Sequence, residues 1–426
     1  MSSDPPQDVY VWIYLAGRNE PVVAGRLYRT GTRFFFNYGR SYLANPDAIA
    51  IYTPELPLRP GGQAPLAGLA MPGAIRDAAP DAWGRRVILN RKLGFKGNAA
   101  NIDLLDELTY LLESGSDRAG ALDFQPSPDV YVPRQTRSAP LEDLMTAAEK
   151  VESGIPVTPE LEQALFHGSS LGGARPKALI EDADRKYIAK FSSQKDITNV
   201  VKAEYVAMQL ARAVGIDAAQ TQLVRSAGRD VLLVERFDRM RTNGGWRREA
   251  FVSALTMLEL DEMMARYASY ERLAEIVRRR FADPLTALRE LYARLVFNVL
   301  CGNTDDHARN HAAFWSGTHL RLTPAYDICP QQRTGGEASQ AMLITGDNRM
   351  STLAACLAAA PAFLQEPADA ERLIAGQVET IRARWAEVCD EAELSPVDRR
   401  ILWRGPILNS FAFEGAPAQI ARLAAS

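Results

Sequence analysis

The pattern of hydrophobic positions predicts strands first. Several short segments before residue 53 combine β-branched and aromatic residues, with glycines between them, which is typical of strands. Two helical stretches and one more short strand follow. The predicted strands are 9–15, 22–27, 33–36, 48–52 and 121–124, and the predicted helices are 81–92 and 102–113. We therefore expect the first part of the chain to be β-rich.

A second pattern begins after a proline-rich break. Residues 125–140 contain four prolines and no apolar period, which indicates a boundary. Beyond it, two predicted hairpins flank a helix whose apolar residues recur at helical spacing. The hairpin strands are 178–181 with 187–191 and 221–225 with 231–237, and the helix is 203–214. Helical patterns dominate after about residue 250, apart from short strand-like pieces near Leu320 and Met342.

This order of elements predicts an α+β protein with a bilobal fold in the manner of protein kinases. A mixed β N-terminal lobe would carry an extra N-terminal β-rich subdomain and would be followed by an all-α C-terminal lobe. The expected domains are 1–125, 126–238 and 239–426. A chain of 426 residues with 47% hydrophobic content is long enough to bury two or three cores of this kind.

Composition narrows the classes of function. The formal net charge is −3, so no overall positive field predicts binding to nucleic acid or to a membrane surface. The four cysteines lie far apart without a C-x-x-C pair, which is typical of a reducing compartment. The start of the chain has no secretory pattern, and no apolar run approaches the roughly 20 residues of a membrane span. We therefore expect a cytoplasmic protein that does not enter the membrane.

A glycine-bearing turn precedes the first predicted hairpin. The segment 169–177 has the sequence SSLGGARPK. Glycine lets the backbone approach a phosphate closely, and successive backbone N–H groups can hold the anion. An ordinary entry into a hairpin is the alternative, but the following strand carries Lys190 among apolar residues, which favours phosphate binding. The candidate ATP-binding residues of this segment are Ser170, Gly172, Gly173, Ala174 and Lys177.

Lys190 and a helix carboxylate form the next candidate pair. In kinases, a strand lysine binds the phosphates of ATP and pairs with a glutamate on a helix. Glu204 borders the apolar stripe of the helix that follows, so it is the expected partner. A lysine that only extends to solvent at a strand edge is the alternative. Glu235 and Phe237 end the last strand, where a bilobal kinase holds adenine through backbone groups.

The strongest pattern follows a long predicted helix. Apolar residues recur at helical spacing up to Gly302, and a polar segment, NTDDHARN, follows at 303–310. Asp305 and Asn310 have the D-x-x-x-x-N spacing of a kinase catalytic loop, in which the aspartate accepts the substrate proton and the asparagine binds Mg²⁺. Asp327 would supply a further metal-binding carboxylate. The alternative is that Asp305 and Asn310 only cap helices.

Two other classes of function are rival hypotheses. His307 and His311 have i, i+4 spacing and, with Asp305 or Asp306, could ligate zinc or iron in a metal-dependent hydrolase. Against this, no glutamate lies between the two histidines as it does in zinc proteases, and the glycine-bearing turn would have no role. A kinase fold that binds partners without catalysing a reaction is the other hypothesis.

Several segments together resemble the HipA family, serine/threonine protein kinases that act as toxins of two-gene toxin–antitoxin systems. The resemblance includes the N-terminal part, so it spans most of the chain. The segments that carry it are SSLGGARPK at 169–177 with the Lys190 strand, VERFDR at 234–239, GNTDDHARN at 302–310, TPAYD at 323–327, PELPL at 54–58, DAWGRR at 81–86 and DRAGAL at 117–122.

The resemblance implies an ATP- and Mg²⁺-dependent kinase with assigned residue roles. Ser170 falls at the autophosphorylation position of the family, with Ser169 beside it, and a dianionic phosphoserine in this turn would repel ATP. The other implied roles are catalytic base for Asp305, Mg²⁺ binding for Asn310 and Asp327, phosphate binding for Lys190, and adenine binding for Glu235 and Phe237.

The resemblance also implies partners. Family members phosphorylate aminoacyl-tRNA synthetases, which stalls translation. They are restrained by a helix-turn-helix antitoxin of the HipB type, which also binds operator DNA. We therefore expect a synthetase as substrate and a HipB-type protein, with DNA through that complex, as partners of this chain.

Overall fold

The chain forms two compact units, each built from segments that are separated in the sequence. The computed structural model describes residues 6–93, 104–134, 139–152, 155, 158, 175–192, 198–333 and 336–423. Unit 1 comprises Met1–Lys195, Val224–Val252 and Phe314–Thr318, and unit 2 comprises Asp196–Leu223, Ser253–Ala313 and His319–Ser426. The predicted domain boundaries near residues 125 and 238 stay predictions.

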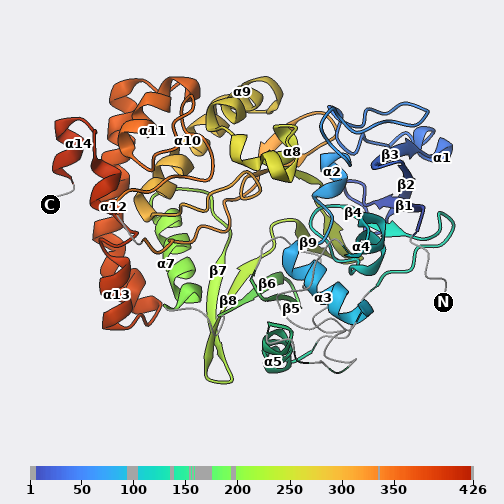
Figure 1. Ribbon diagram of the computed structural model, residues 1–426, viewed down its shortest axis with the longest axis horizontal. Helices are drawn as coiled ribbons and strands as arrows, with labels where there is room; N and C mark the ends of the chain where they lie inside the picture. The colour runs from blue at the N-terminus through green and yellow to red at the C-terminus, as the bar shows by residue number, and fades with distance from the viewer. Residues whose placement is uncertain are drawn as a thin grey trace. The chain divides into compact units, whose positions relative to one another are not determined.

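Unit 1 begins with an antiparallel sheet of four strands (Figure 1). These are β1 (Asp8–Ile13), β2 (Val22–Thr30), β3 (Arg33–Tyr38) and β4 (Leu122–Gln125), in the order β3-β2-β1-β4. Alternate side chains of β3, from Phe34 to Tyr38, are buried, as the two-residue period predicts. The register of β1 with β2 shifts between Val11 and Trp12, which indicates a bulge. The helices of this part are α1 (Arg40–Leu43), α2 (Gly73–Arg76), α3 (Ala82–Leu93) and α4 (Glu107–Glu113).

The predicted strand at 48–52 is wrong. The segment forms no strand, Tyr52 makes only an isolated bridge to Leu56, and several of the other backbone groups bond to side chains. The Ile51 N–H donates to the Tyr38 hydroxyl at 2.8 Å, and the Ala50 carbonyl accepts from the indole N–H of Trp315 at 2.8 Å. Because these groups are satisfied, the apolar composition of the segment reflects its burial and not a position in a sheet.

The second sheet contains both predicted hairpins. Its strands are β5 (Lys177–Glu181), β6 (Lys186–Phe191), β7 (Thr221–Ser226) and β8 (Arg229–Glu235), in the order β5-β6-β8-β7. Ala178, Tyr187 and Ala189 on one face pack into a core with residues of α3 and of α5 (Leu141–Glu152). On the opposite face, Lys177 and Lys190 are direct cross-strand neighbours.

The C-terminal part is not all-α, contrary to the prediction. A hairpin of β9 (Arg239–Thr242) and β10 (Gly245–Arg248) follows the second sheet. A three-stranded sheet has the order β11-β12-β13, made of β11 (Phe251–Ser253), β12 (Ala312–Trp315) and β13 (Leu320–Leu322). These strands have three or four residues each, too few to show a two-residue hydrophobic period in the sequence.

Unit 2 is mainly helical (Figure 1). The helix α7 (Val200–Ala213) packs against α12 (Pro367–Glu391), and α9 (Tyr270–Arg280) packs against α10 (Pro284–Cys301). The other helical elements are α8 (Ala254–Met257), η3 (Glu262–Tyr267), α11 (Leu353–Ala359), η4 (Ala360–Phe363), α13 (Pro396–Leu402), η5 (Ser410–Phe413) and α14 (Ala418–Arg422). Within the described residues, no helix combines the length and the apolar character needed to cross a membrane.

Candidate active site

The polar loop 303–310 leaves α10 at a well-defined point. The helix begins after Asp283, whose carboxylate accepts from the Thr286 N–H, and it ends at Gly302 in a left-handed conformation with φ 70°. A Cβ at position 302 would lie 2.5 Å from the carbonyl oxygen of Pro406, so this end of the helix requires glycine. The buried Asn303 side chain then donates to Oδ1 of Asn298 at 3.0 Å and holds the start of the loop against α10.

The three residues predicted to perform catalysis and bind metal all lie in unit 2. Asp305 is exposed, whereas Asn310 is buried and its amide nitrogen donates to the Asp305 carbonyl at 3.3 Å. Asp327 is half-buried and has φ 59°, an uncommon conformation for a residue other than glycine. The Tyr326 hydroxyl donates to the Arg309 carbonyl at 2.6 Å, which joins the residues next to Asn310 and Asp327. The structure therefore brings the two predicted segments together.

The carboxylates of Asp305 and Asp327 influence each other. Partial burial is the largest cause that raises the pKa of Asp305. The neighbouring His307 opposes this rise, while the negative charges of Asp327 and Asp306 add to it. Two carboxylates whose repulsion raises a pKa in this way form a site that a cation would stabilise.

The donor atoms of these side chains fit Mg²⁺. The Asn310 amide uses its nitrogen in the bond to Asp305, which leaves its oxygen as an electron-pair donor. Mg²⁺ takes few protein ligands, keeps several waters and binds phosphate oxygens. In the described part of the chain, no group of three or more His, Cys, Asp or Glu side chains is arranged to hold a metal. Asn310 and Asp327 would therefore hold Mg²⁺ together with water and nucleotide oxygens.

Two residues that the metal-hydrolase hypothesis proposed as ligands, His311 and Asp306, belong to a buried hydrogen-bonded group behind the loop. Nε2 of His311 lies 2.8 Å from Oδ1 of Asp306 and 3.1 Å from the Tyr270 hydroxyl, which also donates to Asp306. All three side chains are nearly inaccessible to solvent. Asp306 thus faces the interior while the adjacent Asp305 is exposed, so His311 and Asp306 support the loop instead of forming an open zinc or iron site.

Unit 1 carries the lysines that were predicted to bind ATP. Lys177 is only 2% exposed, and its Nζ lies 2.9 Å from Oδ2 of Asp81, so its charge is neutralised inside the unit. Lys190 is half-buried and lies across the hairpin from Lys177. Of the two, Lys190 is the more accessible cation. The remaining predicted residues of the turn, Ser170, Gly172, Gly173 and Ala174, lie outside the described residues.

The other predicted residues have mixed surroundings. Glu204 lies on α7 in unit 2 and is 4% exposed, and because Lys190 belongs to unit 1, their ion pair stays a prediction. At the end of β8, Glu235 accepts from Arg185 at 3.0 Å. The ring of Phe237 packs against two other phenylalanine rings in unit 1, at centroid distances of 5.9 and 5.7 Å.

An ionic cluster in unit 1 escaped the sequence analysis, although it joins two of the segments that carry the resemblance. Asp117 accepts from Arg236 at 3.1 Å and from Arg239 at 2.9 Å. Asp238 accepts from both arginines at 2.9 Å and from the Gly120 N–H at 2.8 Å. The segments lie more than a hundred residues apart in the sequence, so no spacing rule pairs their charges. The one available signal was that both segments, 117–122 and 234–239, are among those that resemble the HipA family.

The fold combines helices and sheets, and the candidate residues follow one another in the order typical of kinases. Two family models match the chain. The HipA-like C-terminal domain matches residues 169–385, and the HipA N-terminal domain matches residues 17–125. The chain belongs to the HipA family.

Individual relatives are more distant. Y4mE of Sinorhizobium fredii, provisionally named as a kinase, is 27% identical over 324 residues, which cover 69% of this chain and 71% of Y4mE. The serine/threonine-protein kinase toxin HipA of Shewanella oneidensis is 25% identical over 277 residues, 53% of this chain and 61% of that protein. A solved structure of Shewanella oneidensis HipA with HipB and operator DNA has a TM-score of 0.67 and 18% identity, and the match covers 98% of this chain and 96% of that chain. This structural similarity shows a shared fold.

Proposed function

We propose that this protein is an ATP- and Mg²⁺-dependent kinase that phosphorylates serine or threonine. The observation that carries the proposal is the grouping of exposed Asp305, buried Asn310 and half-buried Asp327 in unit 2. An aspartate, an asparagine five positions later and a further aspartate are the residues with which kinases orient the nucleophile and hold metal ions. Membership of a family that includes a protein named as a serine/threonine kinase toxin supports the same chemistry.

In this proposal, Asp305 orients the substrate hydroxyl and accepts its proton. The raised pKa of Asp305 makes the carboxylate a stronger base than an ordinary aspartate, which assists proton transfer near neutral pH. Asn310 and Asp327 hold Mg²⁺, which neutralises charge on the phosphates when it is bound. The buried group of Asp306, His311 and Tyr270 keeps the loop backbone in position, so that Asp305 points outward.

Unit 1 would supply the nucleotide contacts. Lys190 binds the ATP phosphates and pairs with Glu204, and the turn around Ser170 covers the phosphates. Lys177 anchors the end of that turn through Asp81, because its ammonium group is already engaged there. The backbone at Glu235, the last residue of β8, and at Phe237 holds adenine.

The proposal extends to regulation and partners. Ser170 is the expected site of autophosphorylation, and an aminoacyl-tRNA synthetase is the expected protein target. A HipB-type helix-turn-helix antitoxin, with operator DNA through that complex, is the expected regulatory partner. The similarity to a HipA that was solved together with HipB and operator DNA supports this pairing.

Transfer of radioactive phosphate from γ-labelled ATP to protein tests the proposal. Replacing the base, Asp305→Asn, should lower the rate by about 10²–10⁴-fold, the usual contribution of general base catalysis. Asp283→Asn is the matched control, because Asp283 is an exposed aspartate of the same unit and asparagine also caps helices. The control should label normally. Full labelling by the Asp305 variant would show that the role is assigned to the wrong residue, and mass spectrometry identifies whether Ser170 carries the label.

A further inference from the structure

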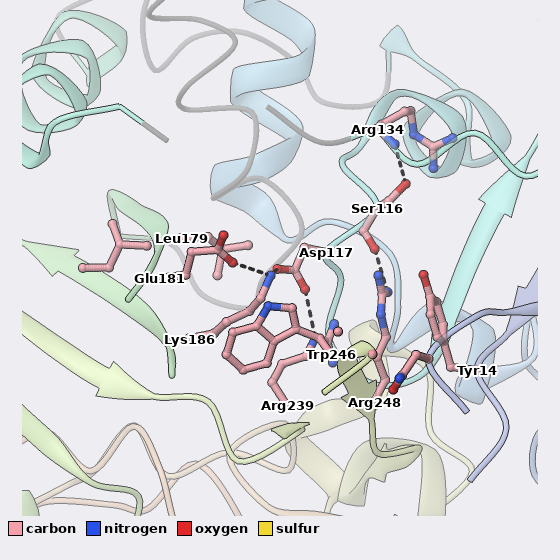
Figure 2. Close-up of a pocket in the computed structure, with 14 residues that line it drawn as sticks. Tyr14, Ser116, Asp117, Arg134, Leu179, Glu181, Lys186, Arg239, Trp246 and Arg248 are labelled. Atoms are coloured by element: carbon pink, nitrogen blue, oxygen red, sulfur yellow. Dashed lines mark hydrogen bonds and ion pairs between the residues drawn. The ribbon is translucent and has the colours of Figure 1, made fainter. Parts of the chain in front are cut away.

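A cavity of about 420 Å³ lies within unit 1, and its volume is that of a small-molecule site. It is formed by the turn 114–118, the β5–β6 hairpin and the β9–β10 hairpin, together with Tyr14, Asn19 and Arg134. Figure 2 shows Asp117 between Lys186 and Arg239, with Arg248 and Tyr14 on the adjoining wall. Among the residues that the structure describes, none of those assigned to ATP, Mg²⁺ or catalysis lines this cavity.

The lining of the cavity has an excess of positive charge. Its described residues include four cationic side chains and two carboxylates, so two positive charges are not balanced within this part of the lining. Asp238 and Asp123 also pair with Arg239 and Arg134 of the lining. Among the described neighbours, their two negative charges are matched by the two positive charges of Arg236 and Arg118, so the sum leaves the excess unchanged. The charged residues of the lining are Arg134, Lys186, Arg239, Arg248, Asp117 and Glu181.

The charge on Asp117 is permanent at neutral pH. Burial alone would favour its protonated form, but the surrounding Arg236, Arg239 and Lys186 hold the pKa of Asp117 well below its usual range. The Lys186 ammonium lies 2.6 Å from this carboxylate and 2.9 Å from that of Glu181. These ion pairs hold Asp117 and Lys186 in place in the wall of the cavity. Because Asp117 and Glu181 are already paired, the excess of positive charge in the lining remains.

Arg248 is already oriented for a ligand. Its guanidinium lies over the Tyr14 ring, 3.9 Å from the centroid, and Nη1 donates to the Ser116 carbonyl at 2.7 Å. These two contacts fix the plane of a group that has five N–H donors, so the remaining donors need little reorganisation to bind an anion. Arg134 adds a second guanidinium, and its side chain is 22% exposed although it pairs with Asp123.

We infer that this cavity binds a small phosphate monoester. A phosphate monoester carries a charge of about −1.5 to −2 near pH 7, which matches the excess of positive charge in the lining. Arginine guanidinium groups bind phosphate oxygens through short charge-assisted hydrogen bonds. Leu179 and Trp246 supply an apolar wall for the organic part of the ligand. Nucleoside monophosphates and phosphorylated amino acids share this chemistry, and binding does not require that the protein transfer phosphate.

Fluorescence titration provides the test, because Trp246 lies in the wall of the cavity. The probes are adenosine 5′-monophosphate and O-phosphoserine, with adenosine and serine as counterparts that lack the phosphate. We expect saturable binding of at least one phosphorylated probe and none of its counterpart, and the probe that binds identifies the source of the monoester. Trp246→Phe, followed by calorimetry, should remove the signal but keep the binding.

Two substitutions with opposite expected effects on affinity test whether the phosphorylated probe binds in this cavity. Arg248→Gln should weaken binding about tenfold, as the loss of a charge-assisted hydrogen bond predicts. Glu181→Gln removes an exposed carboxylate next to Lys186 and should strengthen binding severalfold. Arg26→Gln is the matched control, because Arg26 also lies over a tyrosine ring, but outside the cavity, where it pairs with Asp8. Affinity that is equal in the Arg248, Glu181 and Arg26 variants, or binding of neither phosphorylated probe, would overturn the inference.

Discussion

Replacing Asp238 by asparagine should destabilise unit 1 more than any exposed charge replacement. The Asp238 carboxylate accepts two hydrogen bonds from Arg236, one from Arg239 and one from the Gly120 N–H, all between 2.8 and 2.9 Å. The side chain is 6% exposed and both arginines are 1% exposed. Asparagine has nearly the same shape, so the substitution mainly removes the negative charge.

The magnitude follows from the charges that remain. Without the Asp238 carboxylate, Asp117 is the one carboxylate among the described residues that pairs with Arg236 and Arg239, and it also pairs with Lys186. Removing one partner of a buried ion pair usually costs about 3–5 kcal/mol, because the remaining charge stays buried and unbalanced. Domains are stable by only about 5–15 kcal/mol, so this loss is a large part of the total.

Urea unfolding combined with hydrogen–deuterium exchange measures the effect. The chain has two compact units, so a single transition is not assumed, and exchange in β8 and β9 reports on unit 1 directly. The control is Asp47→Asn, because Asp47 forms an exposed ion pair with Arg18 in the same unit, worth about 0–1 kcal/mol. A loss below about 1 kcal/mol for Asp238→Asn would refute the reasoning from buried charge.

The effect of pH provides a second check on the same variant. Burial would raise the pKa of Asp238, but Arg236 and Arg239 outweigh burial and lower it below the usual value. A carboxyl with a lowered pKa in the folded state stabilises the protein above the pKa of the unfolded chain, and this stabilisation is lost as the pH falls through the folded-state pKa. The difference in stability between the wild-type protein and the variant should therefore shrink in acid, below about pH 4.

Two further predictions concern the catalytic loop. Because the pKa of Asp305 is raised, kcat/KM for phosphate transfer should fall with decreasing pH at a higher pH than an ordinary aspartate would give; an acid limb near pH 4, about the usual aspartate value, would contradict this. Tyr270→Phe removes the hydroxyl that bonds to Asp306 and His311 and should cost about 1–3 kcal/mol of stability. The same variant should transfer phosphate more slowly with an unchanged ATP affinity, and an unchanged rate would separate this buried group from catalysis.

Local periodicity was sufficient to predict much of the fold. The strands β1 to β3 and both hairpins of the second sheet show alternation or apolar runs within a few residues, so each could be recognised from its own segment. The segment 48–52 looks the same in sequence, but Tyr38 and Trp315 satisfy its backbone from distant positions. A hydrophobic pattern indicates that a segment is buried, but it does not indicate which groups form hydrogen bonds with the backbone of that segment.

The part of the candidate site whose residues are close together in the sequence was predictable. Asp305 and Asn310 lie on one loop, so five positions along the chain were enough to pair them. The opposite orientations of Asp305 and Asp306 depend on Tyr270, which lies 36 residues from Asp306 in the sequence. The pairing of Asp117 with Arg236 and Arg239 likewise depends on tertiary contacts, and no single segment contains that information.

Trp315 has a consequence for the biosynthesis of this protein. Its indole N–H bonds to the Ala50 carbonyl, and its ring packs edge-on against Tyr52, yet Trp315 is synthesised only after the first two of the three segments of unit 2. During translation, unit 1 therefore lacks the Trp315 side chain beside residues 50–52 while more than half of the chain after residue 52 is synthesised. A nascent chain arrested before residue 314 should be more sensitive to protease in this region than one that has passed it.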